Sequence, residues 1–99
     1  MFFGIFNIGA TAQCLCTVEN ASGVATVADA LPTFRVYGGS ATPVATGTTS
    51  AFDTGNLTGV YLVSFTVTGG FARGSNYQVV VSYNVSSQLR EKVFSLSIS

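Results

Sequence analysis

The sequence contains no histidine and no tryptophan, and charged residues make up only 8% of its 99 residues. Histidine is the side chain that most readily changes protonation near neutral pH, so its absence removes the usual general base and the usual partner of a nucleophilic serine or cysteine. The carboxylates that remain are scattered in the sequence and lie in or beside expected turns, where Asp commonly accepts backbone hydrogen bonds. They are Glu19, Asp29, Asp53 and Glu91. We therefore expect a protein that is not an enzyme.

The scarcity of charge also limits what the protein can bind. Its four cations and four anions give a formal net charge of zero, whereas an ordinary soluble domain carries roughly 25% charged residues. Phosphate binding needs clustered positive charge, so no nucleic-acid partner is expected. A surface built from Ser, Thr, Gly, Asn and apolar atoms resists self-association poorly. We therefore expect docking to copies of the same chain, as a homo-oligomer, or to a larger assembly.

Neither a membrane span nor a bound cofactor is expected. No segment approaches the roughly 20 continuous apolar residues of a span. The opening apolar run lacks the positive leader of a signal peptide, so synthesis in the cytoplasm is expected. Cys14 and Cys16 stand two apart, a spacing that makes a disulfide within a strand unfavourable, and the chain has no further Cys or His to complete a zinc site. We expect two buried free thiols, and no metal.

Alternation of apolar and polar residues with period two recurs along the chain and indicates β-strands. It is clearest in 61–68 and 77–85, where every second residue is Tyr, Val or Phe, and in the last strand around Phe94. Less regular strands are expected at 13–18, 24–28, 33–37 and 44–52. Turn residues separate these segments about every ten residues, as in a two-sheet sandwich. We predict one all-β domain over 1–99, an antiparallel β-sandwich of about seven strands.

One local pattern is similar to a corner found in immunoglobulin-like and fibronectin-III domains. Phe71, Gly74 and Tyr77 precede a strand in the arrangement apolar-x-x-Gly-x-x-Tyr-x-Val-x-Val. In those domains the tyrosine hydroxyl bonds to upstream backbone and holds the crossover between the sheets. The resemblance implies an immunoglobulin-like sandwich with Tyr77 in that role. Without a Trp or a pair of inter-sheet cysteines, a true antibody-type domain is not expected.

Two features are candidate contact surfaces. The segment 1–10 is apolar at nearly every position, and we expect it to be a docking segment, a first strand, or both. Tyr37 is expected on the outward face of its strand, as an interface contact rather than a sugar-stacking ring. The interface candidates are Phe2, Phe3, Ile5, Phe6, Ile8 and Tyr37.

Most of the chain resembles small structural proteins of tailed bacteriophages. The resemblance lies in the apolar start, the run from Leu31 to Tyr37, the segment Thr58 to Tyr61, and the stretch from Gly70 to Tyr77. It implies a capsid decoration or cement protein in the virion, with the major capsid protein or other virion proteins as partners. A component of the tail, neck or baseplate is the nearest alternative. A free carbohydrate-binding or adhesin module is the alternative from another class.

Overall fold

The computed structural model describes residues 2–53 and 55–99, without the side chains of Phe2 and Phe3. This part of the chain is all-β: it holds eight strands and no helix, and hence no helix that could cross a membrane. The strands are β1 (Phe2–Phe6), β2 (Thr11–Thr17), β3 (Thr33–Tyr37), β4 (Ala45–Thr48), β5 (Ser50–Ala51), β6 (Val60–Thr66), β7 (Asn76–Val85) and β8 (Gln88–Ile98).

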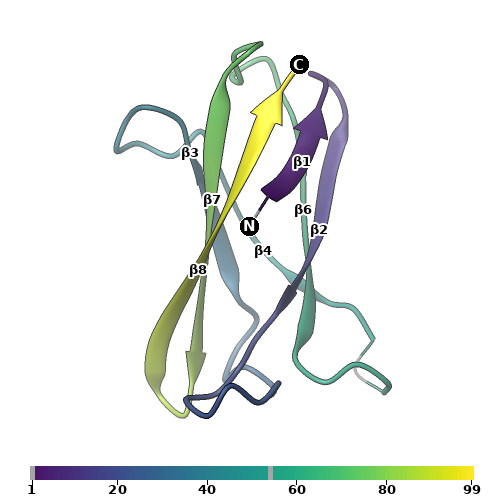
Figure 1. Cartoon of the computed structure of the whole chain (residues 1–99), viewed down its shortest axis with the longest axis vertical. Helices are drawn as coiled ribbons and strands as arrows, with labels where there is room; N and C mark the ends of the chain where they lie inside the picture. The colour runs from purple at the N-terminus through teal and green to yellow at the C-terminus, as the bar shows by residue number, and fades with distance from the viewer. Residues whose placement is uncertain (1, 54) are drawn as a thin grey trace.

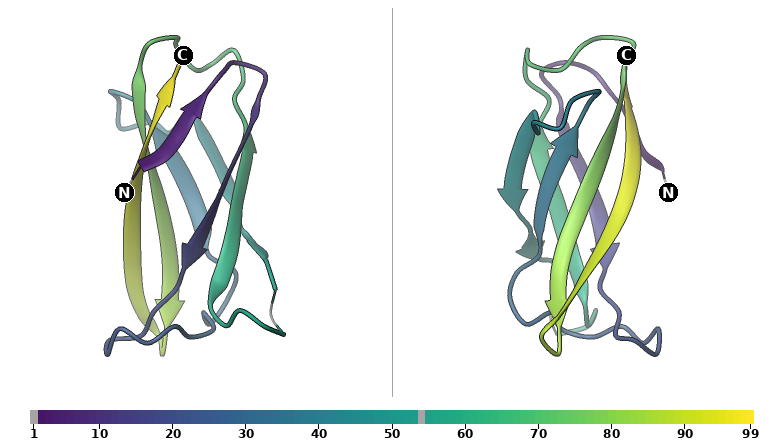
Figure 2. Two further views of the ribbon diagram at one scale, coloured as in Figure 1. Left: turned by 45° about the vertical axis from the view of Figure 1, so that its right-hand side comes forward. Right: turned by 90° about the vertical axis from the view of Figure 1, so that its left-hand side faces the viewer.

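The strands form two sheets (Figure 1). The larger has the order β1-β8-β7-β3-β4 and the smaller the order β2-β6-β5. Every pairing is antiparallel except that of β1 with β8, which run parallel. In the left view of Figure 2 the two sheets face each other, with β7 and β8 on one side and β2 and β6 on the other.

The alternation of the sequence determines which face of each strand is buried. On β6, Tyr61 and Val63 are buried and the intervening Leu62 is half-buried, while on β7 the residues Val79, Val81 and Tyr83 are buried. The half-buried strands predicted at 61–68 and 77–85 are thus confirmed to within two residues at each end. The two apolar faces cover each other, and burial of their side chains is the main force holding the sheets together.

Residues from both sheets make up the main core. Its aromatic part runs between the sheets from Phe34 to Phe65 (ring centroids 5.7 Å apart), on to Phe71 (6.0 Å) and then to Tyr77 (4.8 Å). A second cluster includes Tyr61, near the start of β6, and Tyr83, near the end of β7. The main core consists of Ala12, Cys16, Phe34, Val36, Val63, Val67, Phe71, Tyr77, Val79, Val81, Phe94, Leu96 and Ile98.

The prediction of a single strand at 44–52 is wrong. This segment forms two strands in different sheets, because β4 pairs with β3 whereas β5 pairs with β6. The change of sheet occurs at Thr49, which is 3% exposed. Its backbone N–H and its hydroxyl both donate to the carbonyl oxygen of Pro32, each at 2.9 Å. These two hydrogen bonds give partners to the N–H and the hydroxyl of Thr49, which are buried where the chain passes from one sheet to the other.

Two further expectations need correction. Residues 24–28 form no strand, and the only pairing described there is an isolated bridge between Glu19 and Ala25. Of the two cysteines, which are both free, Cys16 is buried but Cys14 is only half-buried. Both lie on one face of β2, and burial raises the pKa of each thiol, so neither is an activated nucleophile.

The connection between β6 and β7 crosses from one sheet to the other and contains the predicted corner. The hydroxyl oxygen of Tyr77 accepts a hydrogen bond from the backbone N–H of Ala72 (2.7 Å), and its ring meets Phe71 edge-on at 61°. Gly74 has a φ of +75° and donates its N–H to Ile98 (2.7 Å). Tyr77 thus bonds the crossover to the strand that follows it.

An ion pair joins the sheets along one open side. The Nζ of Lys92 on β8 lies 2.7 Å from a carboxylate oxygen of Glu19, just after β2, and also donates to the carbonyl oxygen of Thr17. The hydrogen bond from Lys92, followed by its charge, lowers the pKa of Glu19. Partial burial lowers the pKa of Lys92, but the bond and charge of Glu19 outweigh it and the net change is upward.

Replacing Tyr77 by Phe should remove the bond to Ala72 and leave a backbone N–H without its partner. We expect a loss of about 1 kcal/mol in the free energy of unfolding, measured by urea denaturation. Tyr37→Phe is the control, because the Tyr37 hydroxyl accepts a bond from the Arg35 side chain on the outer face of the sheet. A loss that is no larger for Tyr77→Phe than for the control would contradict the role of the corner.

The ion pair predicts a pH dependence of stability. Because the pKa of Glu19 is lowered on folding, its contribution is present above its unfolded pKa and is lost as pH falls through the lower folded value. Glu19→Gln should therefore lower the denaturation midpoint at pH 7, and this difference should fade below roughly pH 4, near the ordinary pKa of glutamate. In a Lys92→Gln background the substitution should have little effect at any pH. An undiminished difference in that background would contradict the coupling.

Candidate interaction site

Exposed apolar side chains collect on three loops at one end of the molecule. The loops join β2 to β3, β5 to β6 and β7 to β8, and they lie together at the lower end of Figure 1. Single exposed apolar residues are common on protein surfaces, whereas a group of them marks a contact surface. The exposed residues of this end are Val24, Val27, Leu31, Phe52, Leu57 and Leu89.

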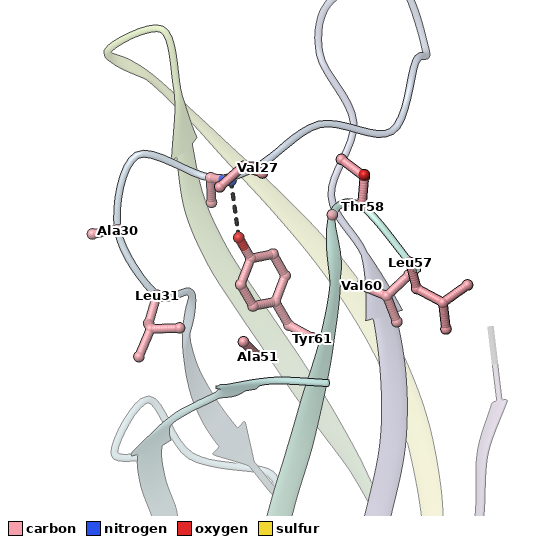
Figure 3. A pocket seen from close by; sticks show the side chains of 10 residues that line it. Val27, Ala30, Leu31, Ala51, Leu57, Thr58, Val60 and Tyr61 are labelled. Carbon is pink, nitrogen blue, oxygen red and sulfur yellow. Dashed lines mark hydrogen bonds between the residues drawn. The ribbon is translucent and has the colours of Figure 1, made fainter. Parts of the chain in front are cut away.

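A hollow of about 230 Å³ opens between two of these loops. Figure 3 shows Val27 and Leu31 of the β2–β3 loop on one side, Leu57 on the other, and the ring of Tyr61 between them. The lining is mostly apolar and consists of Val27, Ala28, Ala30, Leu31, Ala51, Leu57, Thr58, Gly59, Val60 and Tyr61.

The β2–β3 loop has no strand, yet hydrogen bonds hold it against the sheets. The backbone N–H of Ala28 donates to the hydroxyl of buried Tyr61 at 3.0 Å, the bond drawn in Figure 3. Val18 donates its N–H to Gly59 (2.7 Å), and Thr26 donates to Val18 (3.0 Å). These contacts fix one wall of the hollow relative to β6.

Gly59 permits the close approach of the two loops. A Cβ atom at this position would lie 2.5 Å from the backbone oxygen of Thr26 and 2.9 Å from that of Val18. Its φ of +77° is also one that L-residues rarely adopt. Glycine is therefore required here both by the close contact with the β2–β3 loop and by the backbone conformation. Only the close contact depends on that loop.

Asp29 connects the β2–β3 loop to the β7–β8 hairpin. Its carboxylate accepts the backbone N–H groups of Ser86 (3.2 Å) and Ser87 (2.8 Å), and its own N–H donates to Asn84 (2.8 Å). The two serines have φ values of 51° and 63°, in the left-handed region that a two-residue hairpin needs but that serine adopts at a cost. The carboxylate offsets that cost by satisfying both turn N–H groups.

The size and chemistry of the hollow limit what it can bind. It is smaller than the roughly 300–1,000 Å³ of small-molecule sites, but larger than the roughly 150 Å³ that can hold a benzene molecule. Among the described residues there is no group of three His, Cys, Asp or Glu side chains that could hold a metal ion. The hollow therefore has the size and the lining for a single apolar side chain.

The apolar N-terminal segment lies elsewhere in the structure. It forms β1, an edge strand of the larger sheet, on which Ile5 is 67% exposed and Phe6 packs against the main core. Ile8, in the turn after β1, is 39% exposed. The side chains of Phe2 and Phe3, the other two candidates in this segment, lie outside the described residues.

Tyr37 lies on the outer face of the larger sheet and is half-buried. Its hydroxyl accepts a hydrogen bond from Arg35 (3.1 Å), whose guanidinium also bonds Ser82 (3.1 Å) and Glu91 (2.8 Å). The hydroxyl of Ser82 in turn donates to Glu91 (2.9 Å). Tyr37 thus belongs to a polar group on the sheet face and is not part of the hollow.

The residues of the hollow were not among the sequence candidates. The alternation of apolar and polar residues predicts which strand residues are buried, but it does not predict which loop residues come together. The hollow forms where residues 27–31 meet residues 51–61. One signal was available: Val24, Val27, Leu31 and Leu57 are bulky apolar residues in segments otherwise rich in turn residues. Loop residues of this kind are either buried or available for contact.

Replacing Gly59 by Ala tests the packing of the two loops. We expect it to cost about 1–3 kcal/mol more in unfolding free energy than Gly23→Ala, because the added Cβ overpacks the contact with Thr26. Gly23 is a matched control, since its φ is +79° but nothing lies within 4 Å of an added Cβ. Equal losses, measured by urea denaturation, would mean that the loops do not meet as closely as described.

No family model, curated protein or solved structure matches this chain at a significant level.

Proposed function

We propose that this chain is an immunoglobulin-like β-sandwich with a non-enzymatic, structural role in a tailed-phage particle, as a decoration or cement protein docked on the major capsid lattice. The observation that carries the structural role is the surface: it has few charges, and among the residues whose side chains are described eleven large apolar ones are exposed. Such a surface is stable against nonspecific association only when partners cover it. The phage assignment itself rests on the sequence resemblance.

The strand order supports the immunoglobulin-like part of the proposal. In that fold the seventh, sixth and third strands form one sheet, while the second, fifth and fourth lie in the other; variable-type domains add two strands, the first of them beside the third. The orders β8-β7-β3-β4 and β2-β6-β5 correspond to this arrangement. The hydrogen bond of Tyr77 to Ala72 at the crossover agrees with it as well.

The β1 edge is the proposed lattice-facing surface. It presents Ile5, and Ile8 follows in the adjoining turn, so a partner that covers this edge removes two large apolar side chains from water. An exposed edge strand is a site where another chain can add to a sheet. On a symmetric shell each modest contact is repeated at every equivalent position.

The competing carbohydrate-binding role has less support. Sugar sites use polar groups together with exposed aromatic rings, whereas the hollow is lined mainly by Val, Leu and Ala. Tyr37 is half-buried and its hydroxyl already accepts a bond from Arg35. Nothing specific separates capsid from tail, neck or baseplate, and the location on the particle is part of the test.

The proposal is tested by the copy number of the protein on purified particles, measured by quantitative mass spectrometry against the major capsid protein. The Ile5→Ser/Ile8→Ser variant should lower that copy number more than about tenfold, because each buried isoleucine contributes roughly 1.5–3 kcal/mol. Val44→Ser/Leu89→Ser is the control, since these residues are 41% and 67% exposed, Val44 adjoins the opposite edge strand β4, and Leu89 lies at the end of β8 that does not pair with β1. Circular dichroism shows whether each variant is folded.

Two results would contradict the proposal in different ways. Full occupancy of the Ile5→Ser/Ile8→Ser variant would exclude the β1 edge as the docking surface. Absence of the unaltered protein from every purified particle would exclude the structural role in the virion. Recovery with tails rather than heads would replace the capsid by the tail as the site of docking.

A further inference from the structure

We propose that Arg90, Glu91 and Lys92 prevent two copies of this chain from pairing along the open edge of β8. The open edge is the part of β8 from residue 88 to residue 94, whose only strand neighbour in the described part of the chain is β7. The three charged residues are consecutive at its centre. The inference concerns the isolated protein and is independent of its proposed place on a particle.

The open edge exists because β1 covers only the last part of β8. The pairing of β1 with β8 extends from Phe2, opposite Ser95, to Phe6, opposite Ile98. In Figure 1, β1 accordingly lies beside the upper part of β8 alone. Every second residue of 88–94 therefore directs its backbone N–H and C=O groups away from β7. A row of such groups is a template on which another strand can pair.

Sheets limit this kind of pairing by short edge strands or by charged side chains on the edge, Lys above all. The edge strands β4 and β5 are short, with four and two residues. The edge strand β2 is longer, but β1 contacts it, and the Nζ of Lys92 donates to the carbonyl oxygen of its last residue, Thr17. The open edge of β8 has neither a short strand nor a covering neighbour, and it is the edge that carries charge.

Charge is concentrated at this edge although it is scarce in the chain. Of the eight charged residues, three are consecutive here. Two more are bonded to them, because Arg35 pairs with Glu91 at 2.8 Å and Glu19 pairs with Lys92 at 2.7 Å. Five of the eight charged residues thus lie on or against a single strand edge. This is the placement expected of charges that keep an edge from pairing.

The pairing of two identical edges would bring like charges together. Two copies that form one continuous sheet here run antiparallel about a twofold axis, so the residue on the axis lies opposite its own copy. The ladder that uses all of 88–94 has its midpoint at Glu91, which then lies opposite Glu91, while Arg90 lies opposite Lys92. Moving the axis by one residue places Arg90 opposite Arg90 or Lys92 opposite Lys92. Larger shifts reach β1 or the turn before β8. Like charges directly opposite each other destabilise a pair of strands.

The contacts within the chain keep these charges from rearranging into opposite-charge pairs between the copies. Successive side chains of a strand point to opposite faces, so Glu91 is on one face of the sheet while Arg90 and Lys92 are on the other. Glu91 accepts a hydrogen bond from Arg35 on its face, and Lys92 donates to Glu19 on the other. To meet a cation of a second copy, Glu91 would have to leave Arg35 and cross to the opposite face.

Charge reversal at Arg90 tests the proposal on the purified full chain. Arg90→Glu turns both contacts between positions 90 and 92 of the paired edges into opposite-charge pairs and leaves Glu19 with Lys92. The variant should therefore pair at micromolar concentration, whereas the unaltered protein should not pair along this edge. The measurement is amide hydrogen exchange by NMR. In the variant, every second amide of 88–94 should exchange at least about tenfold more slowly when the concentration is raised, because pairing supplies its acceptor.

Arg73→Glu is the matched control. It makes the same change of charge at an exposed residue of the connection between β6 and β7, away from the open edge. Exchange in 88–94 should then stay independent of concentration. A milder pair of variants, Arg90→Thr and Arg73→Thr, adds no carboxylate near Glu19, and Arg90→Thr should pair more weakly than Arg90→Glu. Circular dichroism shows that each variant is folded.

Slower exchange confined to the Arg90 variants supports the proposal, whether or not the unaltered protein associates through another surface. Added salt should then weaken the Arg90→Glu dimer, since salt screens the opposite charges that hold it. Concentration-dependent protection of 88–94 in the unaltered protein would overturn the proposal. So would the absence of that protection in both folded Arg90 variants, or equal protection in Arg73→Glu.

Discussion

The structure depends on one constraint: each sheet has a single apolar face, and the two faces must cover one another. The molecule is thin, with principal extents of 38 × 27 × 19 Å, so there is room for only one layer of side chains between the sheets. The ring of Tyr77 belongs to that layer, and its hydroxyl reaches the crossover at Ala72. The same residue therefore supports the core and the connection between the sheets.

The loop end is held by hydrogen bonds from side chains rather than by strand pairing. Tyr61 contributes its ring to the second core cluster and its hydroxyl to the β2–β3 loop. Asp29 bonds that loop to the hairpin between β7 and β8. These bonds order the loops within the isolated chain. Exposed apolar residues such as Val27 and Leu31 are then held in position to form a surface.

The scarcity of charge links the fold to the proposed role. Glu19 with Lys92 and Arg35 with Glu91 form ion pairs, which place half of the eight charged residues opposite a partner of the same chain. Solubility then depends on small polar side chains and on the covering of apolar ones. Among the residues whose side chains are described, exposed large apolar residues occur at the β1 edge and gather at the loop end, and the proposed role assigns the β1 edge to docking.

The sequence by itself determined the class of the fold and the orientation of its strands. Alternation in 61–68 and 77–85 identified which side chains face inward, because a pleated strand sends successive residues to opposite faces. The pattern ending at Tyr77 located the crossover, where the hydroxyl bond is found. The immunoglobulin-like topology and the phage role remain proposals, since local patterns do not identify a partner.

Only the tertiary structure decided which strands pair and where the loops meet. The run 44–52 is uniformly rich in small and β-branched residues, so nothing local indicates that Thr49 marks a change of sheet; that follows from the carbonyl of Pro32, which is distant in sequence. The hollow likewise needs Val27 and Leu57 side by side, which depends on the close contact at Gly59. The alternation of apolar and polar residues in a segment indicates which of its faces is buried. Which segments lie beside it is determined by contacts between residues far apart in the chain.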